Sequence, residues 1–155
     1  IALSPDGKFI LTDAGKIGEH IENPLRIIDI NNKVADKMIN INLRQFRPPN
    51  TISDHAAMRW VAYLPNGQII FSGFLSLKDL NGRPINDGFH SIFKYDPSTG
   101  EVKRLIETGA HYGEGPNVSY DGKKMSFGTG SPYACNKIYI ANTDSSGLKQ
   151  IQIKL

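Results

Sequence analysis

The sequence predicts an all-β fold built from a repeated antiparallel sheet, and three observations support this. One phrase occurs three times in the 155 residues: an apolar run, a short Asp-Gly or Asn-Gly turn, and a second apolar run. No segment shows convincing helical periodicity. The three copies are separated by intervals of similar length, which indicates an array of one supersecondary unit. The turns are Ser4-Pro5-Asp6-Gly7, Leu64-Pro65-Asn66-Gly67 and Ser119-Tyr120-Asp121-Gly122.

Each of these turns predicts a β-hairpin, because Asn, Asp and Gly tolerate the positive φ angles that a tight hairpin turn needs at both central positions. A third strand is expected after a variable loop, and a fourth after a polar turn rich in Asn, Asp, Ser and Gly. The expected third strands span residues 25–30, 91–95 and 137–141, and the fourth strands span 34–41, 101–106 and 148–153.

Four antiparallel strands repeated along a chain are typical of the blades of a β-propeller. We therefore expect three four-stranded antiparallel blades in a single propeller segment, residues 1–155. Blade 1 covers about residues 1–41, an inter-blade insertion about 42–57, blade 2 about 58–108 and blade 3 about 115–155. A β-sandwich with evenly spaced strands is the alternative. The fixed order of hairpin, loop, strand, turn and strand favours the propeller.

Closure of the ring needs more blades than this chain provides. Closed propellers have about four to eight blades, and three blades alone would expose broad apolar faces and open strand edges to water. We expect either a segment of a longer propeller, as a start at Ile1 without Met suggests, or a homodimer in which two copies close one ring. The expected partners are the remaining blades, a second copy or another protein.

Composition excludes several classes of partner and site. The formal net charge is +3, from 18 basic and 15 acidic residues, and the basic residues are scattered. A nucleic-acid site needs a basic patch, so we expect no nucleic-acid partner. No apolar run approaches the roughly 18 residues of a membrane span. The single cysteine, Cys135, excludes an internal disulfide and a cysteine-rich zinc or haem motif.

The third unit resembles the propeller repeats of TolB-like proteins, from its hairpin VSYDGKKMSFGTG through its last two strands NKIYIANTDSSGLKQI. The first unit shares the SPDGK hairpin, and the second departs from the pattern at Asn66 and in its insertion. The resemblance implies a WD40-like propeller and a periplasmic or secreted location. It does not specify an activity, because this repeat occurs in the TolB translocation factor, oligogalacturonate lyases, prolyl-oligopeptidase-type peptidases and multihaem enzymes.

The longer connections are the expected place for a functional site. Within a blade, the first-to-second and third-to-fourth connections lie on one face of the disc, here called the tight-turn face. The opposite face carries long connections, including residues 73–90, and long loops often carry function. All four histidines fall in these segments, and His55 and His111 are expected near the central channel beside Asp54 or Glu114. Histidine binds divalent metals and acts as a general base, so the candidate metal ligands are His55, His111, His20 and His90.

A second set of residues forms a candidate rim for a ligand or partner. These are loop aromatic residues, one acid, and one cation in a proline-containing linker: Phe74, Tyr112, Tyr133, Glu114 and Arg47. The sequence contains neither a G-x-S-x-G nucleophile elbow nor a glycine-rich loop that opens a helix. We therefore assign no catalytic residue, and a divalent metal is the one candidate cofactor.

Two functions are consistent with these features. The first is a non-catalytic binding or scaffold module that presents loops on one face to a protein, a peptide or a glycan. The alternative is the propeller portion of a larger secreted or periplasmic enzyme with loop histidines near its channel. That enzyme would be a metal-dependent lyase, a prolyl-oligopeptidase-type peptidase or a haem-containing oxidoreductase. The lack of a catalytic motif favours the binding module.

Overall fold

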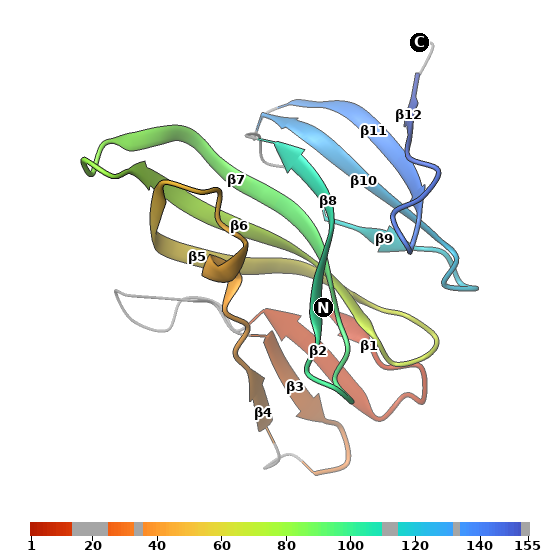
Figure 1. The fold of residues 1–155 in the computed structure, drawn as a ribbon. Helices are drawn as coiled ribbons and strands as arrows, with labels where there is room; N and C mark the ends of the chain where they lie inside the picture. The colour runs from red at the N-terminus through yellow and green to blue at the C-terminus, as the bar shows by residue number, and fades with distance from the viewer. Residues whose placement is uncertain (14–24, 33–35, 110–114, 132–133, 153–155) are drawn as a thin grey trace.

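The computed structural model describes residues 1–13, 25–32, 36–109, 115–131 and 134–152, which fold into three four-stranded antiparallel sheets (Figure 1). Each sheet is a meander in which strands that follow one another in the chain are neighbours. This confirms the predicted all-β fold of three blades. Within the part of the chain that is described, no helix has the length and apolar character of a membrane span.

The elements are as follows. The first sheet contains β1 (Ala2–Leu3), β2 (Phe9–Asp13), β3 (Leu25–Asp29) and β4 (Asp36–Ile39). The second contains β5 (Thr51–Tyr63), β6 (Ile69–Asp79), β7 (Pro84–Tyr95) and β8 (Val102–Gly109). The third contains β9 (Asn117–Val118), β10 (Lys124–Ser131), β11 (Ala134–Asn142) and β12 (Lys149–Ile151). A short 3₁₀ helix, η1 (Leu43–Phe46), links the first two sheets.

The three sheets are arranged with their first strands together. β5 contacts β1 on one side and β9 on the other, whereas β4 and β12 lie away from this centre (Figure 1). In a propeller the first strand of each blade is the innermost one, next to the central axis. The contacts among β1, β5 and β9 therefore fit three neighbouring blades around one axis.

The hairpin turns differ from the expectation in one respect. Gly7, Gly67 and Gly122 have φ angles of 70°, 83° and 69°, but the Asp or Asn before each glycine keeps a negative φ. The expected positive φ at both positions was therefore wrong. Asp6 contributes instead as an acceptor, because its Oδ1 receives the backbone N–H of Lys8 at 3.1 Å. Glycine supplies the left-handed residue and aspartate fixes the preceding turn.

The second sheet is buried on both faces. Phe93 of β7 stacks on Phe71 at a centroid distance of 5.4 Å and lies 5.1 Å from the ring of Phe46, in the core shared with the first sheet. Ile70 of β6 belongs to a second core together with Met125 of β10. Burial of both faces explains why the strands of this sheet are almost continuously apolar.

The second sheet extends beyond the expected blade. Residues 73–90, which we expected to form a long loop, are instead the paired ends of β6 and β7 and the turn between them. In that turn Gly82 has a φ of 80°, and the backbone N–H of Arg83 donates to Asp79 Oδ1 at 2.8 Å. Residues 51–57, expected in the inter-blade insertion, belong to β5 and pair with β6. We call residues 51–57, 73–79 and 84–90 the blade-2 extension.

Candidate functional site

The blade-2 extension brings three of the predicted site residues together. His55 lies on β5, Phe74 on β6 and His90 on β7, so these histidines are on strands and not in loops. The Phe74 ring centroid is 4.6 Å from that of His90 and 6.2 Å from that of His55. They share a pocket of about 190 Å³, which we call the His–Trp pocket; it is lined by His55, Ala57, Arg59, Trp60, Ser72, Phe74 and His90.

Strand alternation explains this grouping. Side chains two residues apart on a strand point to the same face, so His55 and Arg59 lie on one face of β5 while Met58 enters the core on the other. On β6, Phe74 pairs with His90 of β7 in the strand register. The pocket is thus built on the face of the second sheet opposite to Phe71 and its core.

Trp60 stands out in this pocket because of its backbone. It is the extra residue of a β-bulge in β5, has a φ of 46° and leaves 41% of its surface exposed. A left-handed backbone is unfavourable for a bulky residue and is often associated with functional sites. Gly115 packs directly against the Trp60 side chain, where an added Cβ would be 1.8 Å from the Trp60 Cβ. The residue two positions before β9 therefore constrains the side chain at the edge of the pocket.

The charges around the pocket favour an anionic ligand. Among the described residues that line it, Arg59 carries a charge and none carries a carboxylate. Asp54, expected as a carboxylate neighbour of His55, pairs with Lys78 at 2.5 Å between Oδ2 and Nζ. The hydrogen bond from Lys78 lowers the pKa of Asp54. Asp54 is therefore bonded to a lysine of the extension and does not line the pocket.

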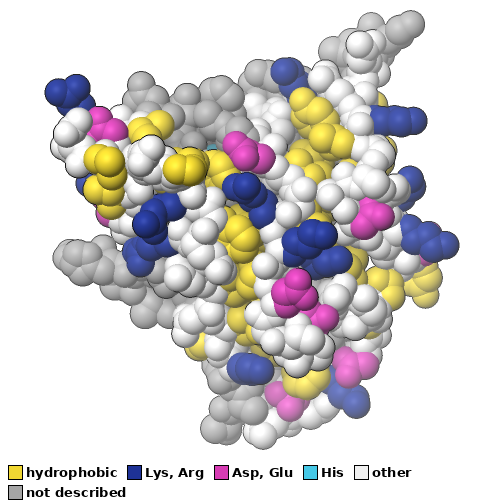
Figure 2. Space-filling model, in the orientation of Figure 1, with side chains coloured by type: hydrophobic (Ala, Val, Ile, Leu, Met, Phe, Trp, Pro, Cys, Tyr) yellow, Lys and Arg dark blue, Asp and Glu magenta, His cyan; other side chains and the backbone are white. Residues whose placement is uncertain are grey.

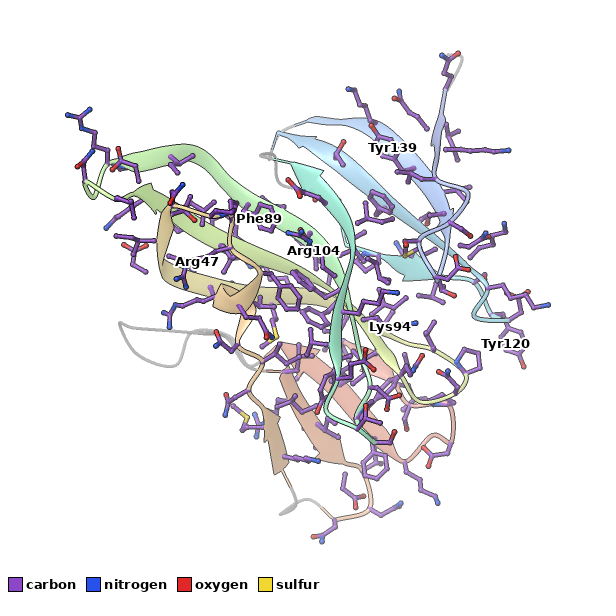
Figure 3. All side chains as sticks on the ribbon, viewed as in Figure 1. Arg47, Phe89, Lys94, Arg104, Tyr120 and Tyr139 are labelled. Carbon is purple, nitrogen blue, oxygen red and sulfur yellow. The ribbon has the colours of Figure 1, made fainter. Side chains whose placement is uncertain are left out.

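The other predicted residues lie elsewhere. Arg47 is exposed and follows η1, on the side of the second sheet that also carries Phe89 and Arg104 (Figure 3). This is the side of Phe93, opposite to Phe74 and His90. Arg47 is therefore not part of the His–Trp pocket. The remaining candidates lie outside the described residues: His20, His111, Tyr112, Glu114 and Tyr133.

A metal centre needs more ligands than the described residues bring together. In the described ranges, no three His, Cys, Asp or Glu side chains lie close enough to hold a metal ion. His55 and His90 offer two imidazoles in one pocket, whereas a protein metal site usually has three or four protein ligands. These two histidines alone do not fit a complete metal site.

A larger cavity lies on the tight-turn face, where we did not expect a site. It has a volume of about 580 Å³ and opens between the first hairpin turns of the first and second sheets. We call it the turn groove; its apolar walls include Pro5, Phe9, Ile27, Tyr63, Pro65 and Pro97. These residues come from two blades, so no local motif could reveal the groove. The available signal of the groove was the proline that precedes the Asp-Gly pair in the first turn and the Asn-Gly pair in the second.

Surface charge is mixed over the face seen in Figure 2. Lysine and arginine side chains are interspersed with aspartate and glutamate, and apolar side chains are exposed between them. This face does not carry a continuous basic stripe of the kind that tracks a nucleic-acid backbone. On this face, charge does not indicate an extended binding surface.

Comparison with protein-family models finds no match, and neither does comparison with curated proteins. Solved structures with a similar fold include an oligogalacturonate lyase in complex with manganese, with a TM-score of 0.60 and 11% identity over 99% of this chain and 39% of that chain. TolB from Acinetobacter baumannii has a TM-score of 0.60 and 22% identity, over 97% of this chain and 31% of that chain.

An oligogalacturonate lyase from Vibrio parahaemolyticus also has a TM-score of 0.60, with 12% identity over 97% of this chain and 38% of that chain. The chain therefore spans between 31% and 39% of the length of these three structures. At these identities the likeness concerns the fold alone. Together with the meander sheets and their adjacent first strands, it shows that this chain folds as consecutive blades of a β-propeller similar to those of TolB and oligogalacturonate lyase.

Proposed function

We propose that this propeller segment is a non-catalytic binding module whose His–Trp pocket holds one acidic sugar unit of a glycan. The observation that carries the proposal is the position of Trp60, exposed and held by Gly115, in the same pocket as Arg59 and His55. The pocket volume of about 190 Å³ suits a single unit better than a long stretch of ligand.

Each pocket residue has a chemical role in this proposal. An indole face offers an apolar platform for the C–H groups of a sugar ring. The Arg59 guanidinium is a planar, permanently charged donor that pairs with a carboxylate through two parallel hydrogen bonds. The His55 imidazole and the Ser72 hydroxyl both exchange hydrogen bonds with sugar hydroxyls. The combination of one aromatic platform and one cation selects an acidic sugar over a neutral one.

The setting of the module is also part of the proposal. Oligogalacturonate, which two of the structurally similar enzymes are named for, is an acidic glycan. The likeness to TolB supports a periplasmic or secreted location. Exposed apolar residues on the outer two sheets, such as Leu3 at 59% and Ile151 at 38%, fit contact with further blades of a longer chain or with a second copy.

The test uses the fluorescence of Trp60, the only tryptophan of the chain. Titration with short oligogalacturonates is expected to give a saturable change, and a neutral glycan of equal length is expected to give none. Arg59→Gln is expected to weaken binding by about tenfold or more, since a charged hydrogen-bond partner is lost. Arg83→Gln, an exposed change at the tip of the extension, is the matched control. No saturable signal, or equal affinity in Arg59→Gln, would overturn the proposal.

A metal-dependent enzyme is the second candidate, and the presence of His55 and His90 in one pocket favours it. Such a centre would require a further ligand, for which His20 and His111 are the proposed donors. Elemental analysis of the purified chain is expected to show a stoichiometric divalent metal that is lost in both His55→Ala and His90→Ala. A natural chain without metal, or variants that retain as much metal as the natural chain, would contradict this candidate. Circular dichroism of both variants confirms that the β-sheets are retained.

A further inference from the structure

We propose that the turn groove binds a proline-rich peptide segment that carries a basic residue. The groove lies on the opposite face of the blades from the expected long loops, and its described lining residues differ from those of the His–Trp pocket. Its volume of about 580 Å³ is within the range of roughly 300–1,000 Å³ that is common for ligand sites. This inference is therefore independent of the proposed glycan site.

The walls of the groove are apolar, aromatic and rigid. Phe9 follows the first hairpin turn, and Tyr63 precedes the second. Pro5 and Pro65 occupy equivalent positions in these turns, and their rings fix the backbone φ angle. Pro65 is held from behind by the third hairpin, because a Cβ at Gly122 would lie 2.4 Å from the Pro65 Cδ. Little side-chain freedom is therefore lost when a ligand enters.

Walls of this kind suit a polyproline II segment. Such a peptide is already extended in solution, so binding orders it at low entropic cost. Aromatic-lined grooves bind proline-rich segments because the ridges of the peptide pack between aromatic rings. Phe9 and Tyr63 supply these rings here, one from each of the two blades that border the groove.

Tyr63 also provides a polar contact. Its ring is half-buried, and this burial is the main cause that raises the pKa of its hydroxyl. The negative charge of Asp6 raises this pKa further. The hydroxyl thus stays protonated at neutral pH and can donate a hydrogen bond. Proline-rich peptides leave their backbone carbonyls free of internal hydrogen bonds, so they offer acceptors along their whole length.

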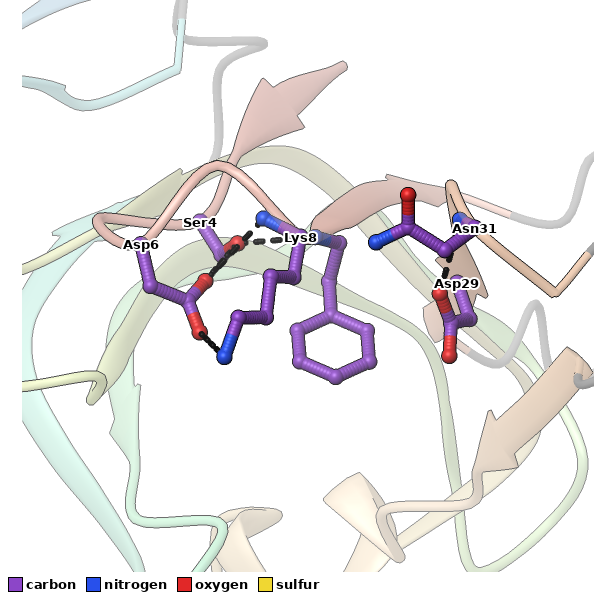
Figure 4. A network of polar contacts seen from close by, with 6 residues as sticks. Ser4, Asp6, Lys8, Asp29 and Asn31 are labelled. Atoms are coloured by element: carbon purple, nitrogen blue, oxygen red, sulfur yellow. Dashed lines mark hydrogen bonds and ion pairs between the residues drawn. The ribbon is translucent and has the colours of Figure 1, made fainter.

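The charges that line the groove favour a basic residue on the ligand. Among the described residues, Asp6 and Asp29 line it together with one cation, Lys37. Ser4 Oγ donates to Asp6 Oδ1 at 2.7 Å, a contact that lowers the pKa of Asp6 and keeps it ionised (Figure 4). Asp29 is fixed by the backbone N–H of Asn31 at 2.9 Å. Asp6 Oδ2 also pairs with Lys8 Nζ at 3.9 Å, an exposed and therefore weak contact. A basic residue of the ligand would compete with Lys8 for Asp6 and would add a partner to Asp29.

The test uses a synthetic PxxP peptide with one arginine, titrated into the chain by calorimetry. Saturable binding is expected, with loss when the prolines are replaced by alanine and when the arginine is replaced by glutamate. Tyr63→Phe is expected to weaken binding about three- to tenfold, because one hydrogen bond is lost. Lys37→Gln is expected to strengthen binding severalfold, because Lys37 is the only cation among the described residues that line the groove.

Lys149→Gln, on the exposed β12 of the third sheet, is the control for an unspecific change of net charge and is expected to leave the affinity unchanged. The strengthening in Lys37→Gln keeps the test independent of folding, since a damaged protein would not bind more tightly. Failure of the arginine peptide to bind, tighter binding of the glutamate peptide, or equal effects of Lys37→Gln and Lys149→Gln would each overturn the proposal.

Discussion

Gly115 and Trp60 are in direct contact across the boundary between the second and third sheets, and this contact leaves no room for a side chain at position 115. An added Cβ would lie 1.8 Å from the Trp60 Cβ and 2.3 Å from its Cγ. Gly115→Ala is therefore expected to lower the free energy of unfolding by about 1–3 kcal/mol, the usual cost of overpacking. Urea denaturation followed by circular dichroism measures this change.

Trp60→Gly supplies the control for this prediction. It removes the side chain that meets position 115, and glycine adopts the positive φ of this bulge without strain. In a double-mutant cycle, Gly115→Ala is expected to lower the free energy of unfolding much less in the Trp60→Gly background than in the natural chain. An equal cost in both backgrounds would show that the contact with Trp60 is not the cause.

Phe93 is the centre of the core between the first and second sheets, with 1% of its surface exposed. Phe93→Ala is expected to lower the free energy of unfolding by about 3–5 kcal/mol, because the ring contacts with Phe71 and Phe46 are replaced by a cavity. The same urea experiment measures it. Ile85→Ala, at a side chain that is 39% exposed, is the control and should cost far less. Similar costs for both variants would contradict the assigned core.

Asp96 is expected to make stability depend on pH in the acid range. Ser98 Oγ and Gln68 Nε2 donate to its two oxygens at 2.5 and 2.9 Å, and these bonds lower its pKa from 3.8 to about 2. Because the pKa is lower in the folded state, the stabilisation is complete above about pH 4 and is lost as the pH falls towards 2. Asp96→Asn should remove this part of the pH dependence.

Urea midpoints measured from about pH 5 to about pH 2 test this prediction for both proteins. Asp144 serves as the comparison. Ser146 lowers the pKa of Asp144 by a hydrogen bond within one turn, whereas the hydrogen bond from Gln68 to Asp96 joins two turns. Gln68→Ala is expected to reduce the acid sensitivity partly, since the bond from Ser98 remains. Identical midpoint curves for the natural chain and Asp96→Asn would rule out this role for Asp96.

Gly82 closes the tip of the blade-2 extension with a φ of 80° and no heavy atom within 4 Å of an added Cβ. Gly82→Ala should therefore lower the free energy of unfolding by about 1–2 kcal/mol, and only because alanine must adopt a left-handed backbone there. Gly82→Asn should cost less, because asparagine tolerates the left-handed region. Hydrogen exchange of the amides of residues 73–90 measures both effects. Equal exchange rates in the two variants would exclude a backbone origin.

The repeated hairpins were predictable because their information is local. In the first unit, Ser4, Asp6 and Gly7 are close in sequence and make their hydrogen bonds with one another or with the next two residues. The blade-2 extension was missed although Asn81-Gly82 is a turn of the same type. We expected a loop over residues 73–90, but alternation of Leu75 and Leu77 with polar residues was the signal of a continuing strand.

The candidate site was predictable only in part. Sequence reasoning named His55, His90 and Phe74 as site residues but placed them in loops, so it could not foresee that strand pairing makes them neighbours. The exposed position of Trp60 could not be foreseen, because a bulge cannot be read from apolar character. The turn groove depends on how two blades pack, and Tyr63 and Phe9 are distant in sequence. Apart from the prolines repeated in the two turns, the packing between these blades leaves no local signal in the sequence.

The two bulges of β5 have a consequence for how this blade can change. β5 uses 13 residues to face the 11 residues of β6, and the two surplus residues are Asp54 and Trp60. Deleting either one would restore regular pairing and leave the inward and outward sides of the strand as they are. The residues of β5 that pair with β6 are thus distinct from Asp54 and Trp60, which this pairing does not require. The Trp60 side chain could therefore be gained, exchanged or lost in evolution without a change in the strand pairing of this blade.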